Sequence, residues 1–130
     1  MSKAPRNPKM FYVTHPFVCV NAREPGNPRG SCAEKGSKEL HGYMKARAKE
    51  LGIKNIRVNQ SGCLDRCELG PNLLIQPEGI WYQIRSKADV DEILQKHIIE
   101  GGRVDRLMLE PTDRLPQDVE ARRAKATAAE

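Results

Sequence analysis

The sequence predicts an α/β protein with a mixed four-stranded sheet and two main helices. Two long segments carry apolar residues at helical spacing, while the other apolar segments are short and rich in Val and Ile, as strands are. Segments rich in Gly and Pro separate them. The order is strand–helix–strand and then strand–strand–helix, so the sheet should contain both parallel and antiparallel pairs.

The first half of the chain is predicted to form a strand–helix–strand unit. Its helix places Leu40, Met44 and Ala48 on one face. Ser37 is a suitable cap for the start of this helix and Gly52 for its end. The two strands should be parallel, because a helical crossover returns the chain in the same direction. The expected elements are a strand at residues 17–20, a loop at 21–36, the helix at 37–51 and a strand at 53–58.

The second half is predicted to contain a hairpin and a helix. Pro77-Glu78-Gly79 is a turn signal between two apolar segments. In the helix that follows, Ser86 and Asp89 resemble a capping box, and Gly101-Gly102 ends the helix. The expected elements are a loop at residues 61–71, strands at 73–75 and 80–84, the helix at 86–100 and a short packed segment at 104–109.

One domain is expected, with polar segments at both ends. Residues 1–9 are predicted to be a flexible arm, residues 10–110 the folded domain, and residues 111–130 a polar C-terminal extension. Within the extension, residues 119–129 are expected to be a frayed helix or disordered. The element order of the domain is the thioredoxin-type arrangement.

The composition argues against several classes of function. The chain has 22 Lys and Arg against 17 Asp and Glu, a formal net charge of +5, but the two signs are interleaved and no aromatic residues line a basic patch. No apolar run approaches the roughly 20 residues of a membrane span, and no signal peptide is recognisable. We therefore expect a cytoplasmic protein with no nucleic-acid or membrane partner. Because no catalytic triad, acid pair or phosphate loop is recognisable, the protein is not expected to be an enzyme.

The chemistry of the sequence lies in four cysteines, Cys19, Cys32, Cys63 and Cys67, separated by x12, x30 and x3. All four lie in or beside the two predicted loops, so scattered core cysteines fit poorly. In a reducing compartment, four cysteines more often bind a metal or perform redox chemistry than form disulfides. A thioredoxin-type dithiol is disfavoured as well, because it uses Cys-x-x-Cys at the start of a helix.

Two kinds of metal centre accept four thiolates: tetrahedral zinc and an iron–sulfur cluster. Zinc sites usually have two short Cys knuckles, and here only Cys63 and Cys67 form one. A 2Fe–2S cluster is larger, so a long loop and a short loop held by one sheet suit it better. Glycines at positions 30, 62 and 70 would let backbone N–H groups approach the sulfurs. Zinc stays open as the alternative.

The cysteine spacing and the sequence around it resemble one family, the thioredoxin-like 2Fe–2S ferredoxins. The segments that carry the resemblance are Phe17-Val18-Cys19-Val20-Asn21, Gly62-Cys63-Leu64-Asp65-Arg66-Cys67, Gly70-Pro71 and Pro77-Glu78-Gly79-Ile80-Trp81-Tyr82. The resemblance covers about residues 15–110. The same cysteine pattern occurs in the small subunit of NADH dehydrogenases and hydrogenases, but the Pro-x-Gly-x-Trp-Tyr segment favours a stand-alone ferredoxin.

The resemblance implies one 2Fe–2S cluster per chain, with four cofactor-binding metal ligands: Cys19, Cys32, Cys63 and Cys67. It implies a one-electron carrier that shuttles electrons between redox proteins, such as a reductase and an electron acceptor. It also implies a homodimer whose interface uses the sheet or its edge. The alternatives are an iron–sulfur redox sensor, an electron-transfer subunit of a larger oxidoreductase and a zinc-stabilised interaction module.

Other residues near these motifs have simpler predicted roles. Trp81 and Tyr82 are adjacent in a strand, so they should face opposite sides of the sheet. The three histidines are not expected to be ligands, because four cysteines are available. Arg66 lies between two of the predicted ligands, where it either stabilises an anionic cluster or points to solvent.

Overall fold

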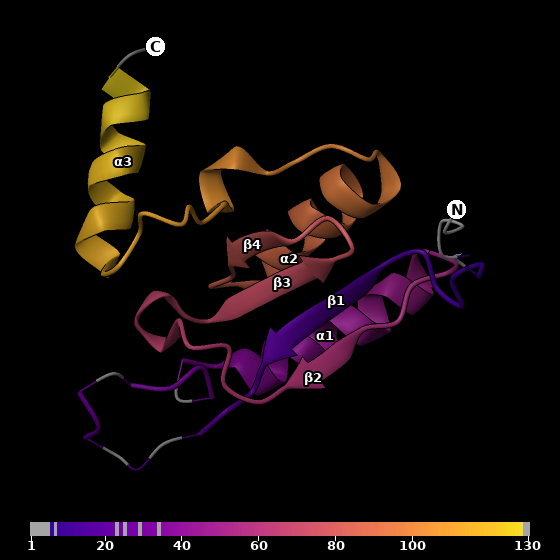
Figure 1. The fold of residues 1–130 in the computed structure, drawn as a ribbon, viewed down its shortest axis with the longest axis horizontal. Helices are drawn as coiled ribbons and strands as arrows, with labels where there is room; N and C mark the ends of the chain where they lie inside the picture. The colour runs from indigo at the N-terminus through magenta and orange to yellow at the C-terminus, as the bar shows by residue number, and fades with distance from the viewer. Residues whose placement is uncertain are drawn as a thin grey trace, which may run out of the picture.

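Four strands form one mixed sheet in the order β2-β1-β3-β4 (Figure 1). The computed structural model describes residues 6, 8–22, 24, 26–28, 30–33 and 35–128, without the side chains of Cys67 and residues 125–128. β1 pairs in parallel with β2 and antiparallel with β3, and β3 pairs antiparallel with β4. The predicted fold class is therefore confirmed. The strands are β1 (His15–Cys19), β2 (Asn59–Ser61), β3 (Asn72–Gln76) and β4 (Ile80–Gln83).

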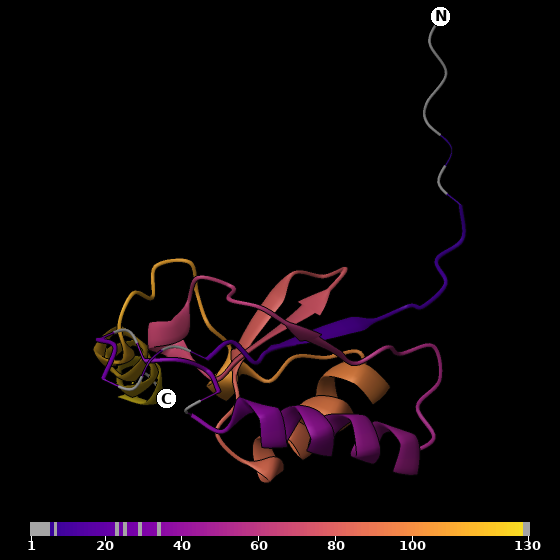
Figure 2. The same cartoon turned by 90° about the horizontal axis from the view of Figure 1, so that it is seen from below.

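Two helical segments cover one face of the sheet (Figure 2). α1 (Ser37–Glu50) connects β1 to β2 and completes the predicted strand–helix–strand unit. α2 (Lys87–Ile93) follows β4 and continues as the π-helical segment η2 (Leu94–Ile99), so the helix predicted at 86–100 changes type after Ile93. Within the described residues, no helix is long and apolar enough to cross a bilayer.

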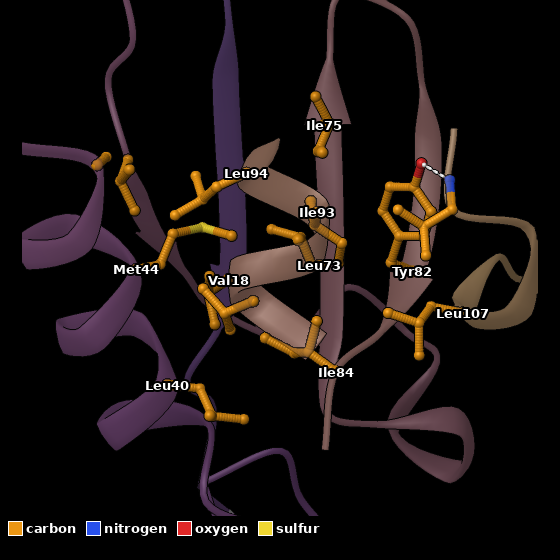
Figure 3. Close-up of a cluster of buried hydrophobic side chains, with 14 residues drawn as sticks. Val18, Leu40, Met44, Leu73, Ile75, Tyr82, Ile84, Ile93, Leu94 and Leu107 are labelled. Atoms are coloured by element: carbon orange, nitrogen blue, oxygen red, sulfur yellow. Dashed lines mark hydrogen bonds between the residues drawn. The ribbon is translucent and has the colours of Figure 1, made fainter. Parts of the chain in front are cut away.

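The main core lies between this face of the sheet and the helices (Figure 3). Alternate strand residues, such as Val18 in β1 and Leu73 in β3, point toward the helices and are fully buried. The register pairs these two residues directly across the sheet. Other fully buried members of the core are Met44, Ile75, Tyr82, Ile84, Val90, Ile93 and Leu94.

The opposite face of the sheet carries an apolar row across three strands. Phe17 pairs with Leu74, and Leu74 pairs with Trp81, so the three side chains line up from β1 to β4. All three are half-buried. As predicted, Trp81 and Tyr82 face opposite sides: Tyr82 is fully buried in the main core, and Trp81 packs in a second apolar cluster.

The second strand of the predicted strand–helix–strand unit is displaced from its expected position. The prediction placed it at residues 53–58, but the ladder with β1 begins at Asn59, and Ile56 makes only an isolated bridge to Thr14. The cause is Asn55, which has a left-handed backbone conformation with φ 61° and turns the chain there. Its carbonyl accepts the N–H of Val13 at 2.8 Å.

Of the two predicted N-terminal helix caps, one differs in the structure and one is confirmed. α1 is capped by Gly36, which has φ 91°, and Ser37 is already helical, so the predicted Ser37 cap is wrong. The chain enters α1 through a turn in which Cys32 O accepts the Ser37 N–H at 3.1 Å, and this turn requires a left-handed residue. The Ser86 cap of α2 is confirmed by the N–H of Asp89, 3.2 Å from Ser86 Oγ.

The chain after α2 packs along the edge of β4. The 3₁₀ turn η3 (Asp105–Leu107) and the bridge between Met108 and Tyr82 form the short packed segment that the sequence predicts. α3 (Pro116–Ala128) follows as a regular helix rather than a disordered tail. Its Val119 is fully buried against Leu69 and Leu109, because these residues complete the cluster around Trp81. The arm predicted at residues 1–9 lies mostly outside the described residues.

Candidate metal centre

The cysteine loops lie at one end of the sheet, where β1 ends and β3 begins (Figures 1 and 2). Cys19 is the last residue of β1, and Cys32 lies in the long loop between β1 and α1. Cys63 lies in the shorter loop after β2, and Cys67 begins the 3₁₀ turn η1 (Cys67–Leu69). The mixed sheet thus brings both loops to the same end of the molecule, as the sequence predicts.

The first loop (residues 20–36) is closed by backbone hydrogen bonds around Cys32. Ala33 donates its N–H to Asn21 O at 3.1 Å, which returns the loop to the end of β1. Gly30 has φ 66°, and a Cβ there would lie 3.3 Å from Lys35 Cε, so this position favours glycine. Cys19 and Cys32 are both fully buried.

The second loop (residues 62–71) turns tightly over Cys63. Asp65 has φ 61° and directs its backbone N–H to Cys63 Sγ at 3.2 Å. This N–H would partly neutralise a thiolate at Cys63. Cys63 is exposed, in contrast to Cys19 and Cys32. The second loop therefore presents the accessible side of the cysteine site.

Arg66 is turned toward its own loop. Its guanidinium donates to Asp65 O at 2.6 Å, and the side chain is 42% exposed. The guanidinium thus holds the turn between Cys63 and Cys67 and stays in contact with solvent. These contacts support a structural role for Arg66. Its stabilisation of an anionic cluster stays a prediction.

Backbone and side-chain bonds join the two loops to each other. Val20 donates its N–H to Ser61 O at 3.0 Å, which joins the chain after Cys19 to the chain before Cys63. Asn72 Nδ2 lies 3.6 Å from Cys32 Sγ in the first loop and 2.6 Å from Arg66 O in the second. Sequence reasoning missed Asn72, although a polar residue at the start of an apolar strand was a visible signal.

α3 also reaches this end of the sheet. Arg123 donates to Gln83 Oε1 at 3.5 Å, and Gln83 pairs with Asn72 across the β3–β4 ladder. Burial, followed by the positive charges of Arg85 and Arg122, lowers the pKa of Arg123. α3 therefore adds positive charge on the side of the sheet where the cysteine loops lie, which the sequence did not reveal.

The described side chains fit a cluster held by thiolates. Cys19, Cys32 and Cys63 provide thiol sulfurs, and N–H donors point at the last two. Among the described side chains, which leave out Cys67, no three His, Cys, Asp or Glu gather into a site for one metal ion. The four ligands that the sequence predicts thus share one end of the fold, and the side chain of Cys67 lies outside the described part.

Two of the histidines have contacts of their own elsewhere in the fold. His15 Nδ1 lies 3.4 Å from Asn59 Nδ2. His97 Nδ1 lies 2.7 Å from the hydroxyl of Tyr82, and burial lowers the pKa of His97. Burial also lowers the pKa of His41, and the charge of Lys45 adds to this effect. That none of the three histidines is a ligand stays a prediction.

A thioredoxin-like sheet with two cysteine loops at one end defines a class of small metal-binding redox protein. The chain is 39% identical over 102 residues to a 2Fe–2S ferredoxin of Aquifex aeolicus, covering 77% of this chain and 92% of the relative. It is 36% identical over 96 residues to a 2Fe–2S ferredoxin of Clostridium pasteurianum, covering 73% and 94%. No family model matches the chain.

Solved structures agree with the sequence relatives. A crystal structure of the wild-type thioredoxin-like [2Fe–2S] ferredoxin from Aquifex aeolicus matches with a TM-score of 0.71 at 36% identity, over 76% of this chain and 98% of that chain. A second structure of a thioredoxin-like [2Fe–2S] ferredoxin from the same organism matches with a TM-score of 0.72 at 35% identity, over 78% and 94%. The chain therefore belongs to the thioredoxin-like 2Fe–2S ferredoxins, a family of electron carriers with a 2Fe–2S cluster.

Proposed function

We propose that this chain binds one 2Fe–2S cluster through Cys19, Cys32, Cys63 and Cys67 and shuttles single electrons between redox proteins. The observation that carries the proposal is the convergence of the two cysteine loops at one end of the sheet, with Asn72 joining them. A 2Fe–2S cluster accepts and releases one electron at an all-cysteine site, at about −400 mV in plant-type ferredoxins. The protein's contribution is to hold the thiolates, donate N–H groups to them and leave one side accessible.

The difference in exposure between the loops supports electron exchange through the second loop. Cys19 and Cys32 are fully buried, whereas Cys63 is exposed. A cavity of about 560 Å³ lies beside this loop, and its lining includes Leu64, Arg66 and Trp81. We infer that a reductase or an electron acceptor approaches over this loop, because Cys63 is exposed there while Cys19 and Cys32 are buried.

The test is the spectrum and metal content of anaerobically purified protein. We expect visible absorption that bleaches with dithionite, an electron paramagnetic resonance signal of the reduced protein, and two irons and two acid-labile sulfides per chain. Substitution of Cys63 or Cys67 by Ser should abolish or alter that signal. His15→Asn, the matched control outside the loops, should leave it unchanged. A colourless protein with one zinc per chain would contradict the proposal and favour a zinc-stabilised module.

We propose further that two copies of the chain form a homodimer through the open side of the sheet. The edge of β4 is covered, since Leu109 donates its N–H to Trp81 O at 2.9 Å. The exposed apolar residues before β1, with the half-buried Phe17 and Leu74 on the same strand and its neighbour, support an interface there, because exposed apolar groups are of the kind that mark interfaces. Phe11 is 97% exposed, the highest value among these residues.

Light scattering of the holoprotein over a concentration series tests the dimer. Phe11→Lys should raise the dissociation constant by about tenfold or more, because each buried Phe contributes roughly 1.5–3 kcal/mol. The matched control is Ile99→Lys at the end of η2, which is 48% exposed on the helical side and should change nothing. A monomer at all concentrations, or an equal effect of both variants, would contradict the proposed interface.

The proposed place of action is the cytoplasm, and the proposed activity is electron transfer rather than the conversion of a substrate. The proposed ligand role of the cysteines supports the cytoplasm, because a reducing compartment preserves thiols. Membership of the 2Fe–2S ferredoxins supports electron transfer. Rapid, reversible reduction by a ferredoxin reductase, with no stable complex after gentle purification, would support the carrier. A stable complex with a larger oxidoreductase would instead identify the chain as a subunit.

A further inference from the structure

Asn72 is a buried polar residue at the first position of β3, and none of its surface is exposed. Its side chain lies on the face of the sheet that points away from the helices, because the adjacent Leu73 points into the main core. An amide nitrogen has two hydrogens, and Nδ2 of Asn72 has two acceptors: Cys32 Sγ at 3.6 Å and Arg66 O at 2.6 Å. One side chain thus contacts both cysteine loops.

The amide oxygen of Asn72 indicates that stability alone does not explain why an asparagine stands at this position. Oδ1 of Asn72 is buried and has no hydrogen-bond partner among the described residues. A buried acceptor without a partner is destabilising by about 1–3 kcal/mol, so an apolar side chain at this position would avoid that cost. A buried polar group of this kind calls for an explanation in the chemistry of the site.

We propose that Asn72 is a positioning residue that donates a hydrogen bond to the Cys32 thiolate and thereby raises the reduction potential of the cluster. The inference rests on the proposed ligation by Cys32. Reduction adds one negative charge to the cluster and its ligands, so an N–H donor on a ligand sulfur stabilises the reduced state more than the oxidised state. The bond to Arg66 O fixes the amide, so that the remaining hydrogen points at the sulfur.

Three variants of the holoprotein separate this role from packing. Asn72→Leu keeps a similar size and removes the donor, and Asn72→Asp keeps the shape but places only acceptors near the sulfur. Gln83→Leu is the matched control: Gln83 is buried, pairs with Asn72 across the ladder and donates to Gly70 O at 3.4 Å. Gln83 thus contacts the backbone of the second loop, whereas Asn72 also contacts a ligand sulfur.

The readout is the reduction potential from a redox titration monitored by electron paramagnetic resonance, on protein with two irons and two sulfides per chain. Asn72→Leu should shift the reduction equilibrium about threefold to tenfold toward the oxidised state, up to about 59 mV lower for a one-electron couple. Asn72→Asp should shift it further in the same direction, and Gln83→Leu should stay within twofold of wild type. A loaded Asn72→Leu protein within twofold of wild type, or shifted upward, would overturn the inference.

A second measurement uses the wild-type holoprotein, in case the Asn72 variants do not assemble a cluster. Asparagine labelled with ¹⁵N at its side-chain amide should give a hyperfine coupling to the reduced cluster, and absence of that coupling would overturn the inference. Failure of the proposed ligation has a different signature. It would appear as wild-type protein without a 2Fe–2S signal, or as a Cys32→Ser variant with an unchanged signal.

Discussion

The two faces of the sheet come from the same four strands but bury different chemistry. On the face under α1 and α2, strand residues such as Val18 and Leu73 pack into an apolar core. Beside them on the other face, Cys19 and Asn72 are equally buried, yet they belong to the cysteine site. The face under the helices thus provides most of the stability, and the other face buries polar groups that hold the cysteine loops.

The largest expected effect is a loss of unfolding free energy, which should differ between two adjacent residues of β3 on opposite faces of the sheet. Leu73 is fully buried in the main core, and Leu74 is half-buried in the row on the other face. Leu73→Ala should lower the free energy of unfolding by about 2–5 kcal/mol, because it leaves a cavity in a packed core. Leu74→Ala should lower it by about 1 kcal/mol. Urea denaturation of both holoproteins measures the difference.

The reduction potential of the holoprotein also separates the two faces of the sheet. Leu73→Ala should leave the potential of the folded holoprotein unchanged, since Leu73 points away from the cysteine site. Equal losses of unfolding free energy in Leu73→Ala and Leu74→Ala would contradict the division between the two faces of the sheet. A change of potential in Leu73→Ala larger than the change in Asn72→Leu would contradict it as well.

A smaller effect is expected where α3 packs on the site face. Asp113 is 2% exposed and accepts hydrogen bonds from Arg122 Nη2 at 2.7 Å and from the N–H of Glu110 at 2.8 Å. Burial opposes the charge, but these donors hold the pKa of Asp113 below its usual range. Asp113→Asn should lower the free energy of unfolding by about 1–3 kcal/mol, because it breaks a largely buried ion pair.

Hydrogen exchange shows where the stability at α3 is lost. In Asp113→Asn, the amides of residues 116–128 should exchange faster, while those of α1 keep their protection. The control is Asp118→Asn, because Asp118 is exposed and the amide keeps an oxygen that can accept the N–H of Leu115. Unchanged exchange in α3 of Asp113→Asn would show that the pair does not hold this helix.

The smallest expected effect is the pH dependence of the unfolding free energy that His97 gives to the main core. The Tyr82 hydroxyl accepts the N–H of Val104 at 3.1 Å (Figure 3). Its own hydrogen is therefore assigned to His97 Nδ1. Burial, and then the charge of Arg103, lowers the pKa of His97 below the unfolded value of about 6.5. The stability contributed by neutral His97 is therefore present above that pH and is lost as pH falls below it.

Denaturation at pH 7, 6 and 5 tests this dependence. The wild-type protein should lose up to about 1.4 kcal/mol of unfolding free energy per pH unit below pH 6.5 from this one group. His97→Gln keeps a polar partner for Tyr82 and should show a shallower slope, while His41 contributes equally in both proteins. An identical pH dependence of unfolding free energy in wild type and His97→Gln would show that burial does not lower the pKa of His97 in the folded protein.

The elements of the fold that follow from side-chain periodicity were predictable from the sequence. The apolar face of α1 and the hairpin of β3 and β4 appear close to their expected positions. The start of β2 and the cap of α1 were not, because Asn55 and Gly36 adopt left-handed conformations that only the surrounding chain selects. A frayed helix at 119–129 was one of two expectations, but the packing of α3 was not predictable, because its sequence is mostly polar and it buries Val119 only against partners from elsewhere in the chain.

The cysteine site was predictable in composition but not in its supporting contacts. The cysteine spacing, together with the family resemblance, predicted the four ligands, and their ligation of one cluster stays a prediction. The contact of Asn72 with Cys32 depends on β3 starting beside the first loop, and no local pattern reports that distance. The approach of Arg123 to Gln83 depends likewise on where α3 packs.

Native mass spectrometry of the protein purified without oxygen tests most directly whether the four cysteines hold one cluster. If Cys19, Cys32, Cys63 and Cys67 hold one cluster, each chain should carry the added mass of two irons and two sulfides. Each of the four Cys→Ala variants should lose that mass, and His41→Asn should retain it. Full loading of all four variants, or one zinc per wild-type chain, would contradict ligation of a 2Fe–2S cluster by these cysteines.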